Sequence, residues 1–172
     1  MTILRLDLAS LYREGSVELS TRLPVATTLW DGTCIEWEGP VEVELSASIA
    51  GSGEIVVSGL IEGRLKQDCR RCLQSVVSAI EHELMMVFVS NDTEEVEDDD
   101  GIYLFDQGIE ELDLRAAIRE EVVFEVDPYV ICSPDCEGLC PRCGINWNKD
   151  VCNCGEDHNA PRWEALRVLK EK

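Results

Sequence analysis

The sequence predicts the α+β fold class: an antiparallel β meander, open or barrel-like, with one packed helix, then a small C-terminal cysteine-rich module and a terminal helix. Three observations predict this fold. Apolar and polar residues alternate between residues 41 and 90, apolar residues recur at helical spacing between 112 and 126, and six of the nine cysteines follow residue 131. We therefore expect a β-rich core domain at 1–131 and a cysteine-rich module at 132–172.

The core domain is expected to contain two short strands and then three long ones, at about 3–8, 17–23, 41–49, 54–66 and 75–90. In the first long strand, Val41, Val43 and Leu45 alternate with glutamate and serine, which is the pattern of a strand with one buried and one solvent-facing side. The glycines of Gly51-Ser52-Gly53 favour a turn into the next strand. The three long strands together form the predicted meander.

An acidic segment at about 91–100 follows the meander and reads Asn-Asp-Thr-Glu-Glu-Val-Glu-Asp-Asp-Asp. It cannot bury enough apolar surface to offset its ordering entropy and self-repulsion, so we expect a mobile loop. Two interpretations stay open for it. It is either a solvated loop with no further task or an attractive surface for a basic partner.

A short strand at 102–105 and one packed helix at about 112–126 are expected after the acidic loop. Asp113 is the expected helix cap, and Asp127-Pro128 ends the helix because proline disfavours α geometry in the residue before it. The terminal helix is expected to begin at Pro161, with apolar residues on one face.

The composition indicates a globular, acidic protein. With 172 residues and 45% apolar content, the chain can bury a core. Its formal net charge is −20, and residues 1–90, 91–131 and 132–172 carry −6, −13 and −1. Phosphates of bare nucleic acid would be repelled at long range, so the charge favours a basic partner.

The expected compartment follows from two further features. The sequence has no charged segment followed by an apolar one at its start, and its longest uncharged runs, 45–53 and 72–80, are nine residues each. A membrane-spanning helix needs roughly 20 apolar residues. We therefore expect a soluble intracellular protein without membrane contact, in which thiols stay reduced and bind metals or serve redox chemistry.

Eight of the nine cysteines form close pairs, and Cys34 stands alone. The strongest signal is the turn Cys140-Pro-Arg-Cys143-Gly144, because a glycine after the second thiolate lets the chain fold back and point N–H groups at sulfur. The pair Cys152 and Cys154 follows after eight residues. These four cysteines are the expected ligands of one Zn²⁺ ion.

The second set of paired cysteines is Cys69, Cys72, Cys132 and Cys136. A strand bend and the segment leaving a helix can meet in space, which predicts a second zinc site. Two alternatives stay open: the six C-terminal cysteines share one site while Cys69 and Cys72 are free, or Cys69-x-x-Cys72 is a redox pair. The redox alternative lacks the helix after the motif that would lower a thiol pKa.

An enzyme is not expected. A closed four-cysteine site leaves no position for a metal-bound water, and the sequence has no Gly-x4-Gly-Lys loop, Gly-x-Ser-x-Gly elbow or His-Glu-x-x-His motif. His82 is expected to be a packing or surface residue, and His158 is at most a spare ligand beside the last cysteine pair.

In combination, four stretches resemble the large ribosomal RNA subunit accumulation protein YceD family, over roughly residues 60–172. They are Cys69-Arg-Arg-Cys72-Leu73; Ile109-Glu-Glu-Leu-Asp-Leu114 leading to Arg119-Glu-Glu121; Cys132-Ser-Pro-Asp-Cys136-Glu-Gly-Leu-Cys140-Pro-Arg-Cys143-Gly-Ile-Asn146-Trp-Asn148; and Pro161-Arg162 with Leu166 and Leu169. Trp147 stands where the family often has leucine, which should alter only packing.

The resemblance implies a non-enzymatic factor needed for accumulation of large-subunit (23S) ribosomal RNA, and hence for large ribosomal subunit biogenesis in the bacterial cytoplasm or in a plastid. Together with the acidic charge, it favours a basic ribosomal protein of the large subunit, or a pre-ribosomal particle, as the partner. The alternative function is a thiol-based redox or zinc-sensing protein that uses Cys69 and Cys72.

Local RNA contact is expected only where positive charge gathers around the first cysteine pair. The cluster consists of Arg64, Lys66, Arg70 and Arg71, with Asp68 as the only acidic residue among them. These side chains either contact RNA phosphates or merely balance the charge of metal-bound thiolates.

Overall fold

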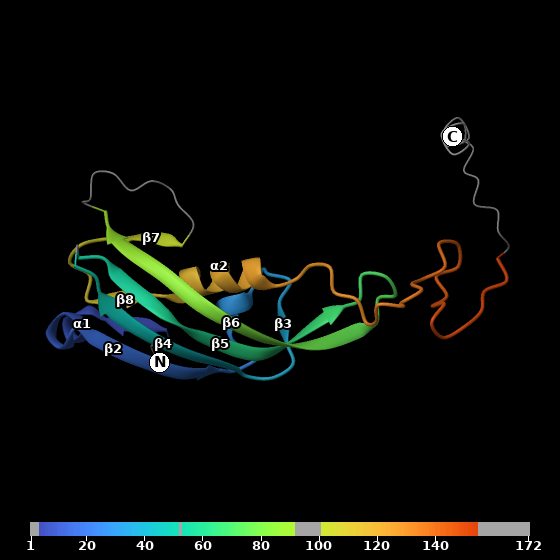
Figure 1. Ribbon diagram of the computed structural model, residues 1–172, viewed down its shortest axis with the longest axis horizontal. Helices are drawn as coiled ribbons and strands as arrows, with labels where there is room; N and C mark the ends of the chain where they lie inside the picture. The colour runs from blue at the N-terminus through green and yellow to red at the C-terminus, as the bar shows by residue number, and fades with distance from the viewer. Residues whose placement is uncertain (1–3, 52, 92–100, 155–172) are drawn as a thin grey trace, which may run out of the picture.

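The computed structural model describes residues 4–51, 53–91 and 101–154 (Figure 1). Within these ranges the chain forms a six-stranded sheet, a separate two-stranded sheet, two α-helices and a short 3-10 helix, η1. The elements are β1 Arg5–Asp7, α1 Leu8–Glu14, β2 Ser16–Leu23, η1 Thr28–Trp30, β3 Glu36–Trp37, β4 Val41–Ile49, β5 Ile55–Asp68, β6 Ser75–Ser90, β7 Ile102–Phe105, β8 Glu111–Asp113 and α2 Arg115–Glu125.

The large sheet has the strand order β2-β4-β5-β6-β7, and β3 pairs with β5 outside this path. The pairs β2–β4, β4–β5 and β5–β6 are antiparallel, whereas β7 runs parallel to β6. The predicted α+β class and meander are therefore confirmed. The barrel-like variant is wrong, because β2 and β7 are edge strands that do not pair with each other and the sheet stays open.

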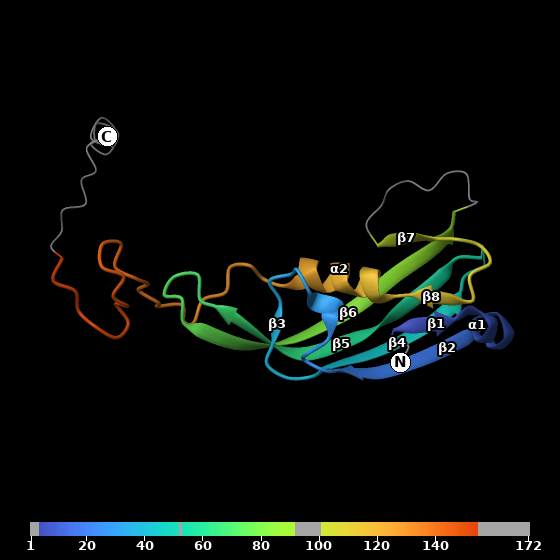
Figure 2. The same ribbon diagram turned by 180° about the vertical axis from the view of Figure 1, so that it is seen from behind.

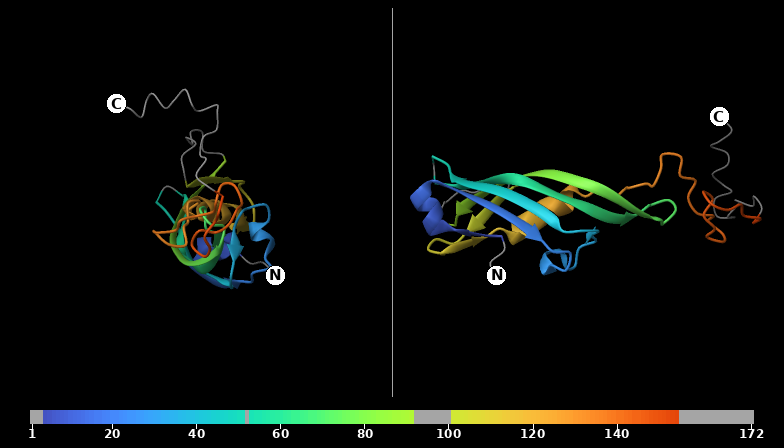
Figure 3. Two further views of the ribbon diagram at one scale, coloured as in Figure 1. Left: turned by 90° about the vertical axis from the view of Figure 1, so that its right-hand side faces the viewer. Right: turned by 90° about the horizontal axis from the view of Figure 1, so that it is seen from below.

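The β5–β6 hairpin is the longest element and pairs continuously from Ile55 and Phe88 to Asp68 and Ser75. Its far end extends beyond the other strands of the sheet, toward the segment that follows α2 (Figure 3). The hairpin thereby carries the Cys69–Cys72 turn away from the core domain and brings it to the cysteine-rich segment.

The core lies between the sheet and α2, which rests on one face of the sheet beside β6 and η1 (Figure 2). Ile118 and Val122 of α2 are fully buried and pack in the same cluster as Ile61 and Met86 of the sheet. Burying apolar side chains of this size stabilises the fold by roughly 1.5–3 kcal/mol each.

His82 of β6 lies against the same helix. Its Nδ1 atom is 3.3 Å from a carboxylate oxygen of Glu125, and its Nε2 atom is 3.7 Å from one of Glu121. The histidine is therefore a packing residue between sheet and helix, as its place in a β run predicted.

The helix near residue 112 begins later than the sequence predicts. Residues 111–113 form β8, which pairs with β1 so that Leu112 and Leu6 are buried side by side. The N-cap of α2 is Leu114, which makes no side-chain capping hydrogen bond. The prediction that Asp113 is the N-cap is thus wrong by one residue, because Asp113 pairs with Arg5 of β1 and ends β8.

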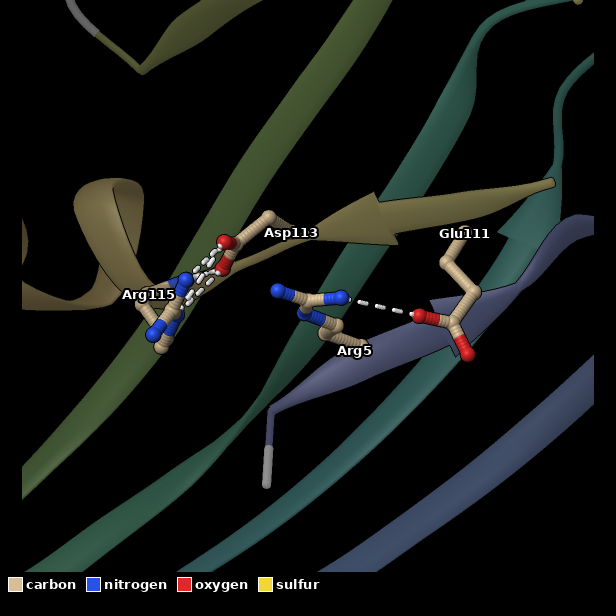
Figure 4. Close-up of polar contacts among 4 residues, drawn as sticks. All are labelled: Arg5, Glu111, Asp113 and Arg115. Carbon is tan, nitrogen blue, oxygen red and sulfur yellow. Dashed lines mark hydrogen bonds and ion pairs between the residues drawn. The ribbon is translucent and has the colours of Figure 1, made fainter. Parts of the chain in front are cut away.

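Polar contacts join β1, β8 and the start of α2 (Figure 4). The Asp113 carboxylate accepts hydrogen bonds from the backbone N–H of Arg115 (3.0 Å) and from its Nε atom (2.8 Å). This pairing lowers the pKa of Asp113, since the guanidinium stabilises the charged carboxylate. Arg5 of β1 donates to Glu111 of β8 over 3.1 Å.

Helix α1 and strand β3 were not predicted. Asp7 caps α1 by accepting a hydrogen bond from the Ser10 N–H (3.0 Å), and Gly15 ends the helix in the left-handed region. The division into units at 1–131 and 132–172 stays a prediction. The expected loop at 92–100 and the helix expected from Pro161 lie outside the described residues.

Candidate metal centres

The described part of the chain contains two groups of four cysteines, and within each group all four sulfur atoms lie within 4.8 Å of one another. We name them by position. The hairpin site consists of Cys69, Cys72, Cys132 and Cys136, and the tail site consists of Cys140, Cys143, Cys152 and Cys154. Each group could hold a metal ion. They are the same two sets that the sequence spacing brings together.

Each site begins with the same tight turn. In the hairpin site, the N–H of Cys69 donates to the Gln74 carbonyl (2.8 Å), and the N–H of Leu73 donates to the Cys69 carbonyl (2.8 Å). The tail site repeats both bonds from Cys140 and Gly144, at 2.8 and 2.9 Å. The residue after the second cysteine has a positive φ in both turns, +57° at Leu73 and +73° at Gly144.

The hairpin site joins two segments far apart in the sequence. Cys69 and Cys136 have their sulfurs 3.8 Å apart, and Cys72 and Cys132 have theirs 3.6 Å apart across 60 residues of chain. Three of the four cysteines are buried, and Cys132 is exposed. The structure therefore brings Cys69 and Cys72 together with Cys132 and Cys136, whereas which of the cysteines bind metal stays a prediction.

Hydrogen bonds between protein groups support this junction around the sulfurs. The backbone N–H of Arg70 donates to the Val130 carbonyl (3.0 Å), and the Arg71 guanidinium donates to the Cys136 carbonyl (2.9 Å). Gly138 lies so close that a Cβ atom there would be 3.1 Å from the Arg71 carbonyl oxygen. The two segments are thus fitted to each other beyond the four sulfurs themselves.

The tail site is closed over a shorter stretch of chain. The sulfurs of Cys140 and Cys152 are 3.5 Å apart, and the indole N–H of Trp147 donates to the Cys152 sulfur over 3.5 Å. The Arg142 guanidinium donates to the Cys154 carbonyl (2.8 Å). This site is less buried than the hairpin site, since only Cys140 among its ligands is buried.

Backbone N–H groups favour the thiolate at the first cysteine of each turn. Burial raises the pKa of Cys69. Backbone N–H groups that point at its sulfur, including that of Cys72, lower the pKa by more than burial raises it, so that the net value is about 6. At Cys140, the N–H groups of Cys143 and Arg142 lower the pKa to about 6. Both turns thus present one sulfur prepared for metal binding.

Crowding has the opposite effect on the partner cysteines. The neighbouring sulfur of Cys136 raises the pKa of Cys132 to about 12, and that of Cys143 raises the pKa of Cys154 to about 12. Adjacent thiolates repel one another without a cation between them. A divalent ion would remove that repulsion, which is why such groups of sulfurs are typical of metal sites.

The donor chemistry fits a soft, tetrahedrally coordinated metal. Four ligands at a Zn–S distance of about 2.3 Å have sulfur atoms roughly 3.7 Å apart. The three sulfur–sulfur separations described above, 3.5 Å, 3.6 Å and 3.8 Å, are close to this value. Thiolates select zinc or iron–sulfur clusters rather than Mg²⁺ or Ca²⁺.

The four basic side chains near the first turn do not form one uniform patch. Arg64 pairs with Glu38 (2.9 Å), and Lys66 lies 3.5 Å from Glu36. The Arg70 guanidinium is stacked 4.3 Å from the ring centre of Tyr129, and Arg71 is bound at the hairpin site as described. Their contact with RNA phosphates stays a prediction.

Two residues of the tail-site loop have roles that were not assigned from the sequence. Asn148 and Trp147 both donate hydrogen bonds to sulfur, so Trp147 does more than alter packing; the available signals were their place between two cysteine pairs and within the motif at 132–148. The positive φ of Leu73 had no signal in its residue type. Cys34 is exposed and belongs to neither site, and His158 lies outside the described residues.

The fold and its sulfur clusters define a class of protein: an open sheet whose longest hairpin is joined to a cysteine-rich tail through one four-cysteine group, with a second such group inside the tail. Residues 57–170 match the family described as Large ribosomal RNA subunit accumulation protein YceD, and the chain belongs to this family. The predicted resemblance is therefore confirmed.

The individual relatives share less than a third of their aligned residues with this chain. The chain is 25% identical over 160 residues to the chloroplastic Large ribosomal RNA subunit accumulation protein YCED homolog 1 of Arabidopsis thaliana, with 77% of this chain and 49% of that protein covered. It is 29% identical over 131 residues to an uncharacterised protein of Mycobacterium tuberculosis strain H37Rv, with coverages of 73% and 60%. For the Bacillus subtilis protein YlbN the values are 28% over 131 residues, 76% and 74%.

The chain therefore spans about half of the plant relative and 60% of the mycobacterial one. No solved structure matches the chain. Among the described residues, no helix is both long and apolar enough to cross a membrane.

Proposed function

We propose that this protein is a non-enzymatic factor that supports accumulation of large-subunit (23S) ribosomal RNA and thereby biogenesis of the large ribosomal subunit. The observation that carries the proposal is membership of the YceD family over residues 57–170. The plant relatives carry both this role and the word chloroplastic in their names. We accordingly place the protein in the bacterial cytoplasm or, in a plant, in the plastid.

In this proposal each cysteine group binds one Zn²⁺ ion in a structural role. Four protein ligands complete a tetrahedral zinc ion and leave no coordination position for water, so the metal holds the chain together and does not activate a nucleophile. The hairpin site would lock the β5–β6 hairpin to the segment after α2. The tail site would fold the loop between residues 140 and 154.

The proposed partner is a basic ribosomal protein of the large subunit, free or within a pre-ribosomal particle. Support comes from a cleft of about 980 Å³ beside α1 and β7, whose lining among the described residues includes the acidic side chains Asp7, Glu54 and Glu110 and no basic one. Its apolar lining includes Phe105, and Tyr12 at its side is 58% exposed. Such a surface suits a lysine- or arginine-containing segment with one apolar anchor.

The mechanism we infer is electrostatic holding. A cleft with carboxylates and apolar side chains would shield a basic segment from unspecific contact with RNA until the segment meets its assembly site. The formal charge of −20 would accelerate the encounter with a basic partner and keep bare RNA away. Any contact with RNA would be local, at the basic side chains near the first turn, and would compete with the protein contacts these side chains already make.

Depleting the protein and measuring precursor and mature 23S RNA tests the role. Reduced mature RNA is expected, and unchanged levels would contradict the proposal. Affinity capture at low and high salt, followed by identification of proteins and RNA, tests the partner, because an acidic–basic contact weakens as salt screening rises.

The place of contact is tested by Glu54→Gln with Glu110→Gln. Capture of the basic partner should fall at least several-fold. The matched control is Glu18→Gln with Glu44→Gln, which removes the same charge from exposed positions of β2 and β4 outside the cleft. Equal loss in both pairs would show that only total charge matters and that the cleft is not the contact.

A further inference from the structure

Two adjacent residues of the tail-site loop point at sulfur atoms of different metal centres. The indole N–H of Trp147 donates to Cys152 of the tail site over 3.5 Å. The side-chain amide of Asn148 donates instead to Cys136 of the hairpin site over 3.4 Å. The loop that closes the tail site therefore supplies a hydrogen bond to the other site.

The orientation of the Asn148 amide is fixed by its neighbours. Its Oδ1 atom accepts a hydrogen bond from the backbone N–H of Glu137 (2.9 Å), which can only donate. The Nδ2 atom is thereby turned toward the Cys136 sulfur, and it also donates to Oδ1 of Asn146 (2.7 Å). One side chain thus holds both a ligand of the hairpin site and the residue that follows this ligand.

Backbone contacts extend the same connection. The N–H of Trp147 donates to the Gly138 carbonyl (3.0 Å), and Leu139 forms an isolated β-bridge with Asn146. Residues 136–140 run directly from the last ligand of the hairpin site to the first ligand of the tail site. The loop at 144–151 is consequently packed along the strip that joins the two centres.

We propose that the two metal centres form one cooperative unit and that Asn148 is the positioning residue that couples them. Metal in the tail site orders the loop that carries Asn148, and the ordered amide then orients Cys136 and offsets part of its thiolate charge. Filling the tail site therefore raises the metal affinity of the hairpin site. By linkage, filling the hairpin site raises the affinity of the tail site by the same factor.

The expected magnitude is that of other groups that hydrogen-bond to metal ligands. Removing such a partner typically weakens metal binding about 10–100-fold. Asn148→Ala should therefore weaken zinc binding at the hairpin site by about tenfold or more when the tail site is filled. The affinity of the tail site measured with the hairpin site empty should stay within about twofold, because the coupling acts only when both sites are filled. Asn148→Asp keeps the acceptor for the Glu137 N–H but places a carboxylate beside sulfur, so it should weaken the hairpin site at least as much.

The inference rests on the proposed zinc sites, and its test separates the two. The full chain, loaded with Zn²⁺, is titrated with a competing chelator, and alkylation with peptide mass spectrometry reports protection of each cysteine group separately. The variants are Asn148→Ala, Asn148→Asp, the tail-site variant Cys143→Ser, and Cys143→Ser combined with Asn148→Ala. The control is Asn153→Ala, since exposed Asn153 makes no side-chain hydrogen bond among the described residues.

Coupling predicts that Cys143→Ser and Asn148→Ala each weaken the hairpin site about tenfold and that their combination weakens it little more than either alone. Asn153→Ala should leave both sites unchanged. If both sites bind zinc but the hairpin site ignores Cys143→Ser or Asn148→Ala, the coupling is wrong and the zinc sites stand. If neither group of the unsubstituted protein is protected, the proposed sites themselves are wrong.

Discussion

Gly138 offers a quantitative test of how tightly the hairpin site joins its two segments. The residue has φ +83°, and a Cβ atom there would lie 3.1 Å from the Arg71 carbonyl oxygen. Alanine in the left-handed region costs roughly 1–2 kcal/mol, and the close contact adds to this cost. The cost appears in the zinc affinity when the tail adopts this conformation only on binding metal. Because 1.4 kcal/mol is a factor of ten, Gly138→Ala should then weaken zinc binding at the hairpin site by about 5–30-fold.

The assay for Gly138→Ala is the chelator titration with separate readout of each cysteine group. Gly15→Ala is the matched control, because Gly15 has φ +80° and nothing within 4 Å of an added Cβ. This variant carries the same backbone cost at the end of α1, so it should lower the free energy of unfolding by about 1 kcal/mol but leave zinc affinity unchanged. Equal zinc affinity of Gly138→Ala and the unsubstituted protein would refute the proposed fit between Arg71 and the tail.

Three further predictions concern single substitutions. Cys69→Ser should reduce bound zinc from two ions per chain to one and expose the rest of the hairpin site to alkylation; retention of two ions would contradict the assignment of this ligand. Leu73→Asn should raise the zinc affinity of the hairpin site by up to about fivefold, since asparagine tolerates the φ of +57° better than leucine; a weaker site would show that the Leu73 side chain matters more than its backbone. Gly59→Ala should destabilise the fold by about 3 kcal/mol or more in chemical denaturation, because the new Cβ would lie 2.0 Å from the Glu44 carbonyl oxygen; Gly39→Ala, with nothing within 4 Å, is the control, and similar stability of both would be inconsistent with this packing.

The regular strands could be predicted because their patterns are local. The third long strand was expected at 75–90 and is β6 Ser75–Ser90, and the short strand was expected at 102–105 and is β7 Ile102–Phe105. Alternating apolar and polar side chains indicate that one face of a strand is buried, and this pattern is visible in the sequence of each strand alone. The open sheet, by contrast, depends on which strands pair at its edges, and no local pattern carries that information.

The same distinction explains the misplaced start of α2 and the missing α1. Residues 112 and 113 were assigned to the helix, but they pair as part of β8 with β1, which lies more than a hundred residues away in the chain. Helix α1 is only seven residues long, so it shows too few turns for a clear period. Its capping by Asp7 and Gly15 was a local signal that the alternating pattern before it obscured.

The metal centres divide in a similar way between local and distant information. The spacing of each cysteine pair already indicated a turn that presents two sulfurs, and the structure places the pairs in two groups of four. The contribution of Asn148 to Cys136 could not be foreseen, because it depends on how the tail-site loop folds back over the strip between the two sites. Asparagine in a loop has many roles, and its residue type alone does not distinguish them.

The presence of two structural zinc centres built from eight cysteines is tested most directly by the metal content of the purified full chain together with cysteine alkylation under native conditions. We predict two zinc ions per chain, eight protected cysteines and rapid alkylation of the exposed Cys34 alone. Rapid alkylation of Cys69 and Cys72 with one zinc ion or none would contradict the hairpin zinc site and would favour the redox alternative.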